Sequence, residues 1–575
     1  MKSLRLFLVC LLISACSLWN SGNAAKKVPT EKAESVAVSL MQSLIPKTDH
    51  SGYFIGKKSF EKTEPVEKGV VLRKEWQKFG PLYFNAVTVD LSQPHLAVEA
   101  EKGRDHLRSG EKVAATAERV SKPGHKVIAA VNGDFWGHNF YPVGLFVDDG
   151  LIYKGPYDER SVFVMDDQNV PHIIRSPMTV AIRKDDESLV IGEINHEAEN
   201  DSVLFHNKYG DSVEFTTPRN VFLLMPSKME FIPNRPCKVT VKSYKKDLAK
   251  ATIPKDAFLL AVEPGASLPF EKVLKPEEKL TLLATLENFD KPVILAVGGV
   301  PRIMRDGEIS IECEEESIRE SFSTTRHPRT ALGISKDKKT LYLMTVDGRQ
   351  PSVSIGQGLK DVAEYLKELG AWDAINLDGG GSTTMWVRGD VTNFPSDAGG
   401  PRTVATSLLV VSNAEKGEPA YVALEPEEFT APAGTRFPLE VSVTDSHYNP
   451  LASYVPELKW EFSDPVEKMD SGMVFLSDNP GKGSVTANLP GKNISDSVSA
   501  QSVNPAEISV NPDTVMMETG ETVDIEVNAF DENGEYIYAM NHMVKADVPD
   551  GLEWLPYQGS LIGKKQGKYD LELSL

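Results

Sequence analysis

Runs of β-branched and aromatic residues, separated by turn residues, dominate the chain between residues 69 and 412. This pattern predicts strands more often than helices. The clearest runs lie at 84–91, 126–131, 292–297, 340–346, 374–377 and 404–411. We therefore expect one domain over 69–412, with a β-rich subdomain at 172–290 where helical signals are few.

Two segments of this region show helical spacing instead. Between residues 359 and 369, apolar residues recur at i, i+3, i+4, i+7 and i+10, which predicts an amphipathic helix. Ser354 and Gln357 are spaced as a capping box before it, and Gly370 stands where the helix should stop. Residues 111–121 are a second candidate helix. With strands on both sides of the first helix, the pattern predicts an α+β domain that has a mixed sheet, few helices and a βαβ-containing core.

The last third of the chain contains an internal repeat. The segment 419–426 matches 505–512 at an offset of 86 residues (419 to 505), and Gly434 and Asp445 then align with Gly520 and Asp531. Period-2 strands between turn residues are typical of all-β, Ig-like sandwich domains. We expect one such domain at 413–504 and a second at 505–575, apparently incomplete for want of a closing strand. Spacer or polymer-binding roles fit both.

The first residues have the pattern of an export signal. Lys2 and Arg5 precede an apolar run at 6–13, so residues 1–25 are read as a signal peptide. Residues 13–16 resemble a bacterial lipobox that would leave a lipidated Cys16, whereas small residues at 22–24 fit cleavage to a freely secreted product. An N-terminal helix and a polar linker are predicted for 26–68. These features indicate a bacterial protein that is extracellular or in the cell envelope, with membrane contact only through a lipid anchor.

The composition of the 575-residue chain disfavours some classes of binding partner. Lys+Arg number 62 and Asp+Glu 82, a net charge of −20, which disfavours nucleic acid and anionic lipid as partners. After export, Cys237 and Cys313 would be the cysteines that remain. They could pair outside the cell, although the sequence does not establish the geometry that a disulfide needs.

Polar residues follow several predicted strands. The sites are Asn132-Gly-Asp134, Arg329, Asp347-Gly-Arg349, Asp378-Gly379-Gly380-Gly381-Ser382-Thr383 and Arg402. Three successive glycines lose much conformational entropy on folding, so a plain turn would not need them. They let main-chain N–H groups approach an anion, with the two hydroxyl side chains as further donors. The alternative is a hairpin connection in which the aspartate caps its own turn.

Arginines and aromatic residues point to the same chemistry. Arg329, Arg349 and Arg402 lie next to Pro or Gly in otherwise apolar segments, and forked guanidinium groups bind phosphate or carboxylate in a bidentate way. Ion pairs with one of the three aspartates are the alternative. Phe135 and Trp136 could form an aromatic wall against which a sugar stacks.

Together these motifs resemble the phosphodiester glycosidase family over about residues 69–412. The resemblance is carried by Asn132-Gly-Asp134, Gly298-Gly299 before Pro301, Pro328-Arg-Thr330, Asp347-Gly-Arg349, Asn376-Leu-Asp-Gly-Gly-Gly-Ser-Thr-Thr384 and Arg402. It implies hydrolysis of a sugar joined through its anomeric oxygen to phosphate, typically an N-acetylglucosamine 1-phosphodiester, with no required cofactor. The expected partner is a phosphate-linked glycan, with contact to a cell-wall polymer through the Ig-like repeats.

The chemistry of these residue types is compatible with cleavage of the C–O bond between the anomeric carbon and the phosphate oxygen. Because the leaving group is a phosphate monoester, one carboxylate acting as base or nucleophile can suffice without a strong general acid. We expect Asp378 or Asp134 in that role and Asp347 orienting Arg349 or substrate hydroxyls, while arginines including Arg329 stabilise the phosphate. Two alternatives remain. The three aspartates could hold Mg²⁺ or Ca²⁺ for P–O cleavage, or the domain could bind an anionic wall polymer without cleaving it.

Overall fold

The computed structural model describes residues 59–574 except 78–79, 158, 197–200, 266–269, 271–273, 471, 535, 538–543 and 556–558. All of them belong to one compact unit. The predicted signal peptide, Cys16 and the N-terminal helix lie outside the described residues. Of the described helices, none is long and apolar enough to cross a membrane.

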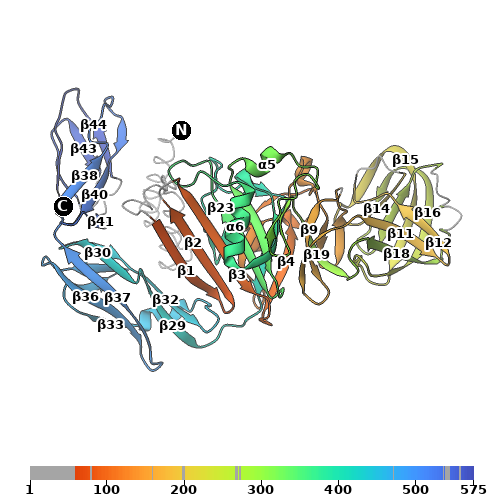
Figure 1. Cartoon of the computed structure of the whole chain (residues 1–575), viewed down its shortest axis with the longest axis horizontal. Coiled ribbons are helices and arrows are strands. Elements are labelled where there is room, and N and C mark those ends of the chain that lie inside the picture. Colours follow the sequence, from red (N-terminus) through yellow and green to blue (C-terminus); the bar gives the residue numbers. More distant parts are fainter. Residues whose placement is uncertain are drawn as a thin grey trace, which may run out of the picture. The chain divides into compact units, whose positions relative to one another are not determined.

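The first large sheet has eight strands, each antiparallel to its neighbours (Figure 1). Its order is β1 (Ser59–Glu67), β2 (Val70–Gln77), β3 (Leu82–Asp90), β23 (Thr340–Val346), β22 (Arg329–Ser335), β24 (Ala371–Asn376), β20 (Arg302–Arg305) and β21 (Glu308–Ile309). In β23 every residue after Thr340 is buried, because both faces of the sheet centre are covered. This explains why the run at 340–346 is almost continuously apolar.

A second, five-stranded antiparallel sheet completes the core of this region. Its order is β26 (Asp390–Val391), β25 (Met385–Val387), β6 (Lys126–Asn132), β28 (Thr406–Ser412) and β4 (Leu96–Lys102). A short ladder of β27 (Thr403–Val404) and β5 (Glu111–Lys112) leads into β28 and into helix α3 (Val113–Val120).

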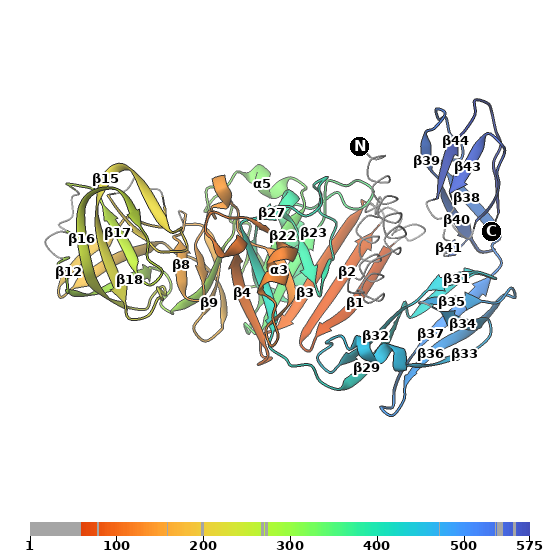
Figure 2. The same cartoon turned by 180° about the vertical axis from the view of Figure 1, so that it is seen from behind.

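The two sheets pack face to face between two helices. One hydrophobic cluster contains Val87 and Leu343 of the first sheet and Val131 and Leu408 of the second. Helix α6 (Leu359–Leu369) buries its apolar stripe on the outer face of the first sheet, and α3 packs on the outer face of the second. Figures 1 and 2 view these layers from the α6 side and the α3 side respectively. The order helix, sheet, sheet, helix places strand ends of both sheets at common edges.

Helix α6 has the predicted bounds but not the predicted start. Gly370 ends it in the left-handed conformation, with φ 105°, and donates its N–H to the carbonyls of Leu366 and Lys367. The N-cap is Gly358, however, and no side chain caps the helix. Ser354 Oγ instead donates to the carbonyl of Asp347 (2.6 Å). The capping-box expectation was therefore wrong, because Ser354 is used by the loop that follows β23.

The expectation of a mixed sheet does not hold for the two face-packed sheets, which are antiparallel throughout, although the sheet of residues 178–286 contains one parallel pair, Glu193–Ile194 with Ser202–Phe205. Strands β23 and β24 flank α6 in the chain and both run antiparallel to β22, so they run in the same direction. They do not pair with each other, because β22 lies between them. The βαβ unit predicted from the strand–helix–strand order thus exists as a split unit, and the domain is mostly β with few helices.

Part of the predicted linker is an edge strand. Residues 46–68 are polar, yet β1 pairs with β2 along its length. Lys62 and Glu64 point toward partners on the sheet, where Glu64 also accepts from Lys74 Nζ (3.0 Å). Edge strands commonly carry charged residues that discourage pairing with other chains. The polar composition of this segment therefore gives no sequence signal for a strand.

Residues 178–286 supply another eight-stranded sheet. Its order is β12 (Glu187–Ile191), β11 (Met178–Lys184), β18 (Lys279–Leu286), β16 (Cys237–Thr252), β15 (Ser212–Pro226), β17 (Phe258–Val262), β14 (Ser202–Phe205) and β13 (Glu193–Ile194). A five-stranded sheet is formed by segments from both sides of it in the chain: β10 (Pro171–Arg175), β9 (Ser161–Asp166), β19 (Val293–Gly298), β7 (Phe146–Asp148) and β8 (Leu151–Lys154). Cys237 and Cys313 are free thiols and do not pair.

The internal repeat is visible in strand pairing. In the first copy β29 (Pro419–Glu425) pairs antiparallel with β32 (Glu440–Asp445), and in the second β38 (Glu507–Asn511) pairs with β40 (Glu526–Phe530) in the equivalent register. Gly434 and Gly520 both have positive φ, 74° and 90°. Each copy buries its own hydrophobic cluster.

The remaining strands of the two copies form short antiparallel ladders, apart from one parallel pair, β30 with β37. The first copy contains β30 (Glu428–Pro432), β31 (Arg436–Pro438), η5 (Ala452–Glu457), β33 (Lys459–Phe462), β34 (Val466–Asp470), β35 (Met473–Leu476), β36 (Gly481–Leu489) and β37 (Ile494–Val503). The second contains β39 (Thr522–Asp524), β41 (Tyr536–Ile537), β42 (Lys545–Asp547), β43 (Leu552–Leu555), β44 (Ser560–Gly563) and β45 (Glu572–Ser574).

Candidate active site

Buried Asn132 joins the ends of the two face-packed sheets. It is the last residue of β6, and its Nδ2 donates to the carbonyl of Asp378, which follows β24 (2.6 Å). Its Oδ1 accepts from Thr330 Oγ1 in β22 (2.8 Å). The N–H of Asp378 donates back to the carbonyl of Gly133 (3.0 Å). Asn132 therefore has a structural reason to be an amide, since it bridges donors and acceptors on two sheets.

Asp134 is a buried carboxylate, 3% exposed. Its N–H donates to Thr406 Oγ1 (2.9 Å), and its Oδ2 accepts from the N–H of Gly144 (2.6 Å). A Cβ on Gly298 would lie 2.7 Å from this oxygen, so the glycine is needed for the close approach. Burial raises the pKa of Asp134 to about 7, the Gly144 bond opposes the rise, and the negative charge of Asp378 adds to it.

Asp378 lies close enough to Asp134 for the two charges to interact. Burial raises the pKa of Asp378 to about 6, while the N–H of Gly379, 2.9 Å from Oδ1, and the positive charge of Arg402 oppose the rise. The pair is therefore expected to titrate as a unit near neutral pH, with Asp134 holding its proton to higher pH than Asp378.

The triple-glycine loop is closely packed. A Cβ on Gly379 would lie 2.8 Å from the carbonyl of Pro328, and one on Gly380 would lie 2.9 Å from Arg349 Nη2. Gly380 also has φ 62°, where a side chain is strained. The loop carries the chain from β24 of the first sheet to β25 of the second, so it is not the hairpin of the alternative reading.

Four of the loop N–H groups are already engaged in this conformation, although that of Gly381 is not among them. Gly379 donates to Asp378 Oδ1, Gly380 to the carbonyl of Pro328, Ser382 to that of Gly379 and Thr383 to that of Gly380. Asp378 thus does cap its own turn. A bound phosphate would depend chiefly on nearby side chains rather than on the backbone nest that the sequence predicts.

Arg402 is oriented by a carboxylate that the sequence did not single out. Its Nε and Nη2 donate to the two oxygens of Asp397 (2.7 and 3.0 Å). A Cβ on Gly381 would lie 2.2 Å from Arg402 Nη2 and 2.1 Å from Asp397 Oδ1. The side chains are 38% and 33% exposed, so the guanidinium lies over the loop with access to solvent. This is the ion pair of the alternative reading, but with a different aspartate.

Arg349 places a positive charge at the surface of the site, where a substrate could contact it. Its side chain is exposed, its φ is 62°, and its Nη2 lies 3.5 Å from His327 Nδ1. Among the described residues, no carboxylate lies within ion-pair distance of it. Burial and the charges of Arg329 and Arg349 lower the pKa of His327, so the positive potential of the two arginines extends to His327. An anionic substrate would find an uncompensated charge here.

Arg329 is buried, 2% exposed, and faces carbonyls instead of carboxylates. Its Nη2 donates to the carbonyls of Phe322 (2.6 Å) and Thr325 (2.8 Å), and its Nε to that of Gln357 (3.3 Å). Burial lowers its pKa to about 10, still well above neutral. Its charge adds to the positive field while its hydrogen bonds hold the short helix α5 (Glu320–Thr324) and the loop before α6.

Asp347 occupies a separate buried position, 1% exposed. Its Oδ1 accepts from Asn393 Nδ2 and its Oδ2 from the N–H of Phe394, each at 2.8 Å. Burial raises its pKa to about 7, which these bonds oppose. In the described part of the chain it therefore neither orients Arg349 nor joins Asp134 and Asp378 in a metal-ligand cluster.

Hydroxyl and aromatic side chains complete the surroundings. Ser382 is buried beside Asp378, and the buried hydroxyls of Thr383 and Thr384 have no hydrogen-bond partner within the described part of the chain. Unpaired buried hydroxyls are costly, which is consistent with donors kept for a ligand. Phe135 and Trp136 pack against other rings, with centroids 6.0 Å from Phe322 and 4.7 Å from Phe140.

Three contributors were missed by sequence reasoning. Lys154, in β8, places a positive charge near Asp134 and lowers the pKa of that carboxyl. Gly144 supplies the N–H that holds it, and Asp397 orients Arg402. Only Asp397 had a local signal, since it lies five residues before Arg402 in the same glycine-rich loop. Lys154 lies in a different sheet, and Gly144 lies just before β7 of that sheet.

Residues 251–411 match the family described as phosphodiester glycosidase, and this segment is a domain of that family. It contains Asp378, Asp347 and the three arginines but not Asp134, which the fold brings to the same edge.

The names of similar curated proteins describe the same reaction class. The chain is 35% identical over 115 residues to the mouse N-acetylglucosamine-1-phosphodiester alpha-N-acetylglucosaminidase, covering 18% of this chain and 22% of that protein. It is also 35% identical over 117 residues to the human protein of the same name, covering 19% and 22%. The chain thus matches about a fifth of the length of these relatives. A hypothetical protein from Synechocystis has a similar fold, with TM-score 0.50, 18% identity and coverage of 61% of this chain and 64% of that one.

Proposed function

We propose that this protein hydrolyses a sugar 1-phosphodiester of the N-acetylglucosamine type. The observation that carries the proposal is a pair of carboxylates, the buried Asp134 and the half-buried Asp378, beside a glycine loop flanked by Arg349 and Arg402. A phosphodiester has one negative charge, and the uncompensated Arg349 suits it. Family membership of residues 251–411 and the names of the curated relatives support the same reaction class.

The lower pKa of Asp378 supports it as the reactive carboxylate of the pair. At neutral pH Asp378, with the lower pKa, is the ionised member and acts as base for water or as nucleophile at the anomeric carbon. Asp134 retains its proton longer and keeps the two charges from opposing each other. The departing phosphate monoester is stabilised by Arg349 and Arg402, so C–O cleavage proceeds without a metal ion.

Hydrolysis of an alkyl N-acetylglucosamine 1-phosphodiester by the purified exported chain tests this proposal. We expect free sugar to appear in the presence of a chelator. Of Asp134→Asn and Asp378→Asn, the variant at the true catalytic position should lower kcat at least about a hundredfold, and the roles assigned above predict that this is Asp378→Asn. Asp390→Asn, an exposed aspartate in β26, is the matched control and should retain full activity.

Three outcomes would reject it. Near-normal rates in both active-site variants would rule out the carboxylate scheme. Turnover abolished by chelator and restored by Mg²⁺ or Ca²⁺ would favour the metal-dependent phosphodiesterase. Tight binding of the diester without turnover would favour a binding module for an anionic polymer.

We also propose export to the cell envelope and a phosphate-linked glycan as the natural substrate, with the repeats at 413–504 and 505–575 as Ig-like spacers or polymer contacts. The basic and apolar start of the sequence supports export. The mass of the mature N-terminus decides the processing: a diacylglycerol on Cys16 indicates a lipoprotein, and a start near residue 25 indicates a secreted protein.

A further inference from the structure

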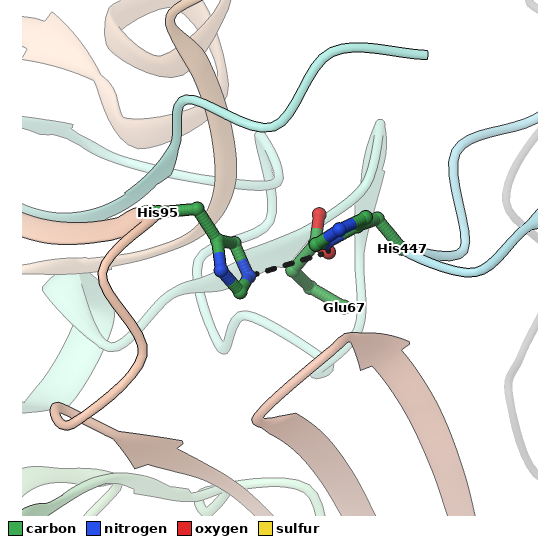
Figure 3. Close-up of side chains that lie close together, drawn as sticks. All are labelled: Glu67, His95 and His447. Carbon is green, nitrogen blue, oxygen red and sulfur yellow. Dashed lines mark hydrogen bonds and ion pairs between the residues drawn. The ribbon is translucent and has the colours of Figure 1, made fainter. Parts of the chain in front are cut away.

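Three metal-ligating side chains meet away from the residues discussed above (Figure 3). Glu67 ends β1, His95 lies between β3 and β4, and His447 follows β32 in the first repeat. Each offers one ligand atom, and the three atoms lie within 4.8 Å of one another. Figure 3 shows His95 directed toward the Glu67 carboxylate with the His447 ring beside it. Segments far apart in the chain thus converge on one carboxylate.

The distances are those of ligands around one small cation. His447 Nδ1 lies 3.0 Å and His95 Nε2 lies 3.7 Å from Glu67 Oε1. Tetrahedral zinc with bonds of 2.0–2.2 Å separates its ligand atoms by about 3.3 Å. The two imidazole rings meet edge to face, with centroids 4.6 Å apart and planes at 83°, so they approach without stacking.

Glu67 is held for this role by its surroundings. Its side chain is fully buried, and its Oε2 accepts from Arg388 Nη2 (3.0 Å). Arg388 also donates to the carbonyls of Val66 (3.0 Å) and His447 (3.1 Å). The arginine therefore fixes Oε2 and the backbone of one histidine. Oε1 faces the two rings and also accepts from the N–H of Lys68 (3.0 Å), whose carbonyl lies 3.1 Å from His95 Nε2. Such orienting contacts are typical of metal ligands.

The repeat shows that the turn does not need a histidine. In the first copy the N–H of His447 donates to Asp445 Oδ1 (2.8 Å), and in the second the N–H of Asn533 donates to Asp531 Oδ1 (2.9 Å). The two turns are equivalent at the 86-residue offset (447 to 533). Only the copy that contacts Glu67 carries the imidazole. His447 therefore has a purpose beyond the turn.

We propose that Glu67, His95 and His447 bind a zinc ion, with water in the fourth position. Imidazole and carboxylate ligands suit zinc and related divalent transition metals. The ion would tie residues 59–412 to the repeat at 413–504, since two ligands come from the first and one from the second. The competing explanation is a hydrogen-bonded network of the same three groups that holds no metal.

Zinc content and cobalt spectra of the metal-stripped full chain separate these explanations. We expect one zinc per chain after dialysis against micromolar Zn²⁺, and visible absorption of four-coordinate Co²⁺ after cobalt loading. His447→Asn keeps the turn residue of the second repeat and should weaken binding at least about tenfold. His125→Asn is the matched control, because His125 pairs with Glu99 alone (3.2 Å) and should leave binding unchanged.

A second readout tests the joining role. Lys416 lies in the exposed segment between β28 and β29, so trypsin can cleave there. Zinc should slow this cleavage in the wild-type chain and not in His447→Asn. Metal content near zero in the wild-type chain, or equal affinity in His447→Asn, would overturn the proposal. Equal cleavage rates with and without zinc would overturn the joining role.

Discussion

Substituting Gly381 by alanine should disable the site with little effect on folding. The new Cβ would lie 2.1 Å from Asp397 Oδ1 and 2.2 Å from Arg402 Nη2, whereas real contacts of this kind are not under 3.0 Å. The two side-chain ends must therefore move by about 1 Å, and the bidentate pair at 2.7 and 3.0 Å is disrupted. Both ends are partly exposed and can yield without disturbing the core.

The magnitude follows from the interaction that is displaced. A hydrogen bond from a charged group contributes about 1.5–3 kcal/mol. If Arg402 stabilises the departing phosphate, its misplacement should lower kcat/KM by about 10- to 150-fold. The free energy of unfolding should fall by less than about 1 kcal/mol, as for other exposed ion pairs.

Kinetics on the phosphodiester and urea unfolding measure the two quantities. Gly399→Ala is the matched control in the loop that carries Asp397 and Arg402, because its Cβ would meet nothing within 4 Å. It should behave as wild type. A kcat/KM of Gly381→Ala within twofold of wild type, in a folded protein, would refute the assignment of Arg402 to the phosphate.

Three further predictions concern the buried aspartates. Burial raises the pKa of Asp134 from its ordinary value to about 7. Between about pH 4 and 7 the folded protein therefore binds more protons than the unfolded chain, and its free energy of unfolding falls as the pH rises. Asp134→Asn should therefore gain stability relative to wild type across that window, by no more than about 4 kcal/mol, in urea unfolding at several pH values; a constant difference would contradict this. Asp347→Asn turns an amide N–H toward a buried donor, so it should lower the free energy of unfolding by about 1–3 kcal/mol while kcat changes less than tenfold. A hundredfold loss of kcat in a stable variant would show that Asp347 takes part in catalysis. Because the ionised member of the pair is the reactive one, kcat/KM should rise as pH increases through the pKa of Asp378, about 6; a flat profile between pH 5 and 8 would count against it.

Local patterns in the sequence predicted many of the elements. The helix at 359–369 and the strand at 340–346 have the expected bounds, because periodicity and glycine stops act within a few residues. The capping box was wrong because Ser354 donates instead to the carbonyl of Asp347 within its own loop. The edge strand β1 was missed because its composition is polar, and its structure depends on β2 rather than on its own residues.

The site was predicted less completely, for a reason that concerns distance in the chain. Asp134, Asp378 and the arginines each follow or precede a strand, which is a local signal. Which of them face one another is set by two sheets packing face to face, and this explains why Asp347 lies apart and why Lys154 approaches Asp134 from a third sheet. Arg402 was expected to pair with one of three named aspartates, but its nearest carboxylate belongs to its own loop.

The position of the oxygen label after hydrolysis in ¹⁸O-water tests the central claim most directly. The full chain would be incubated with an N-acetylglucosamine 1-phosphodiester and chelator, and both products analysed by mass spectrometry. The account predicts label in the free sugar and none in the phosphate, because the carboxylates act at the anomeric carbon. Label in the phosphate would show that the P–O bond breaks and would contradict the assignment of Asp378 as base or nucleophile at carbon.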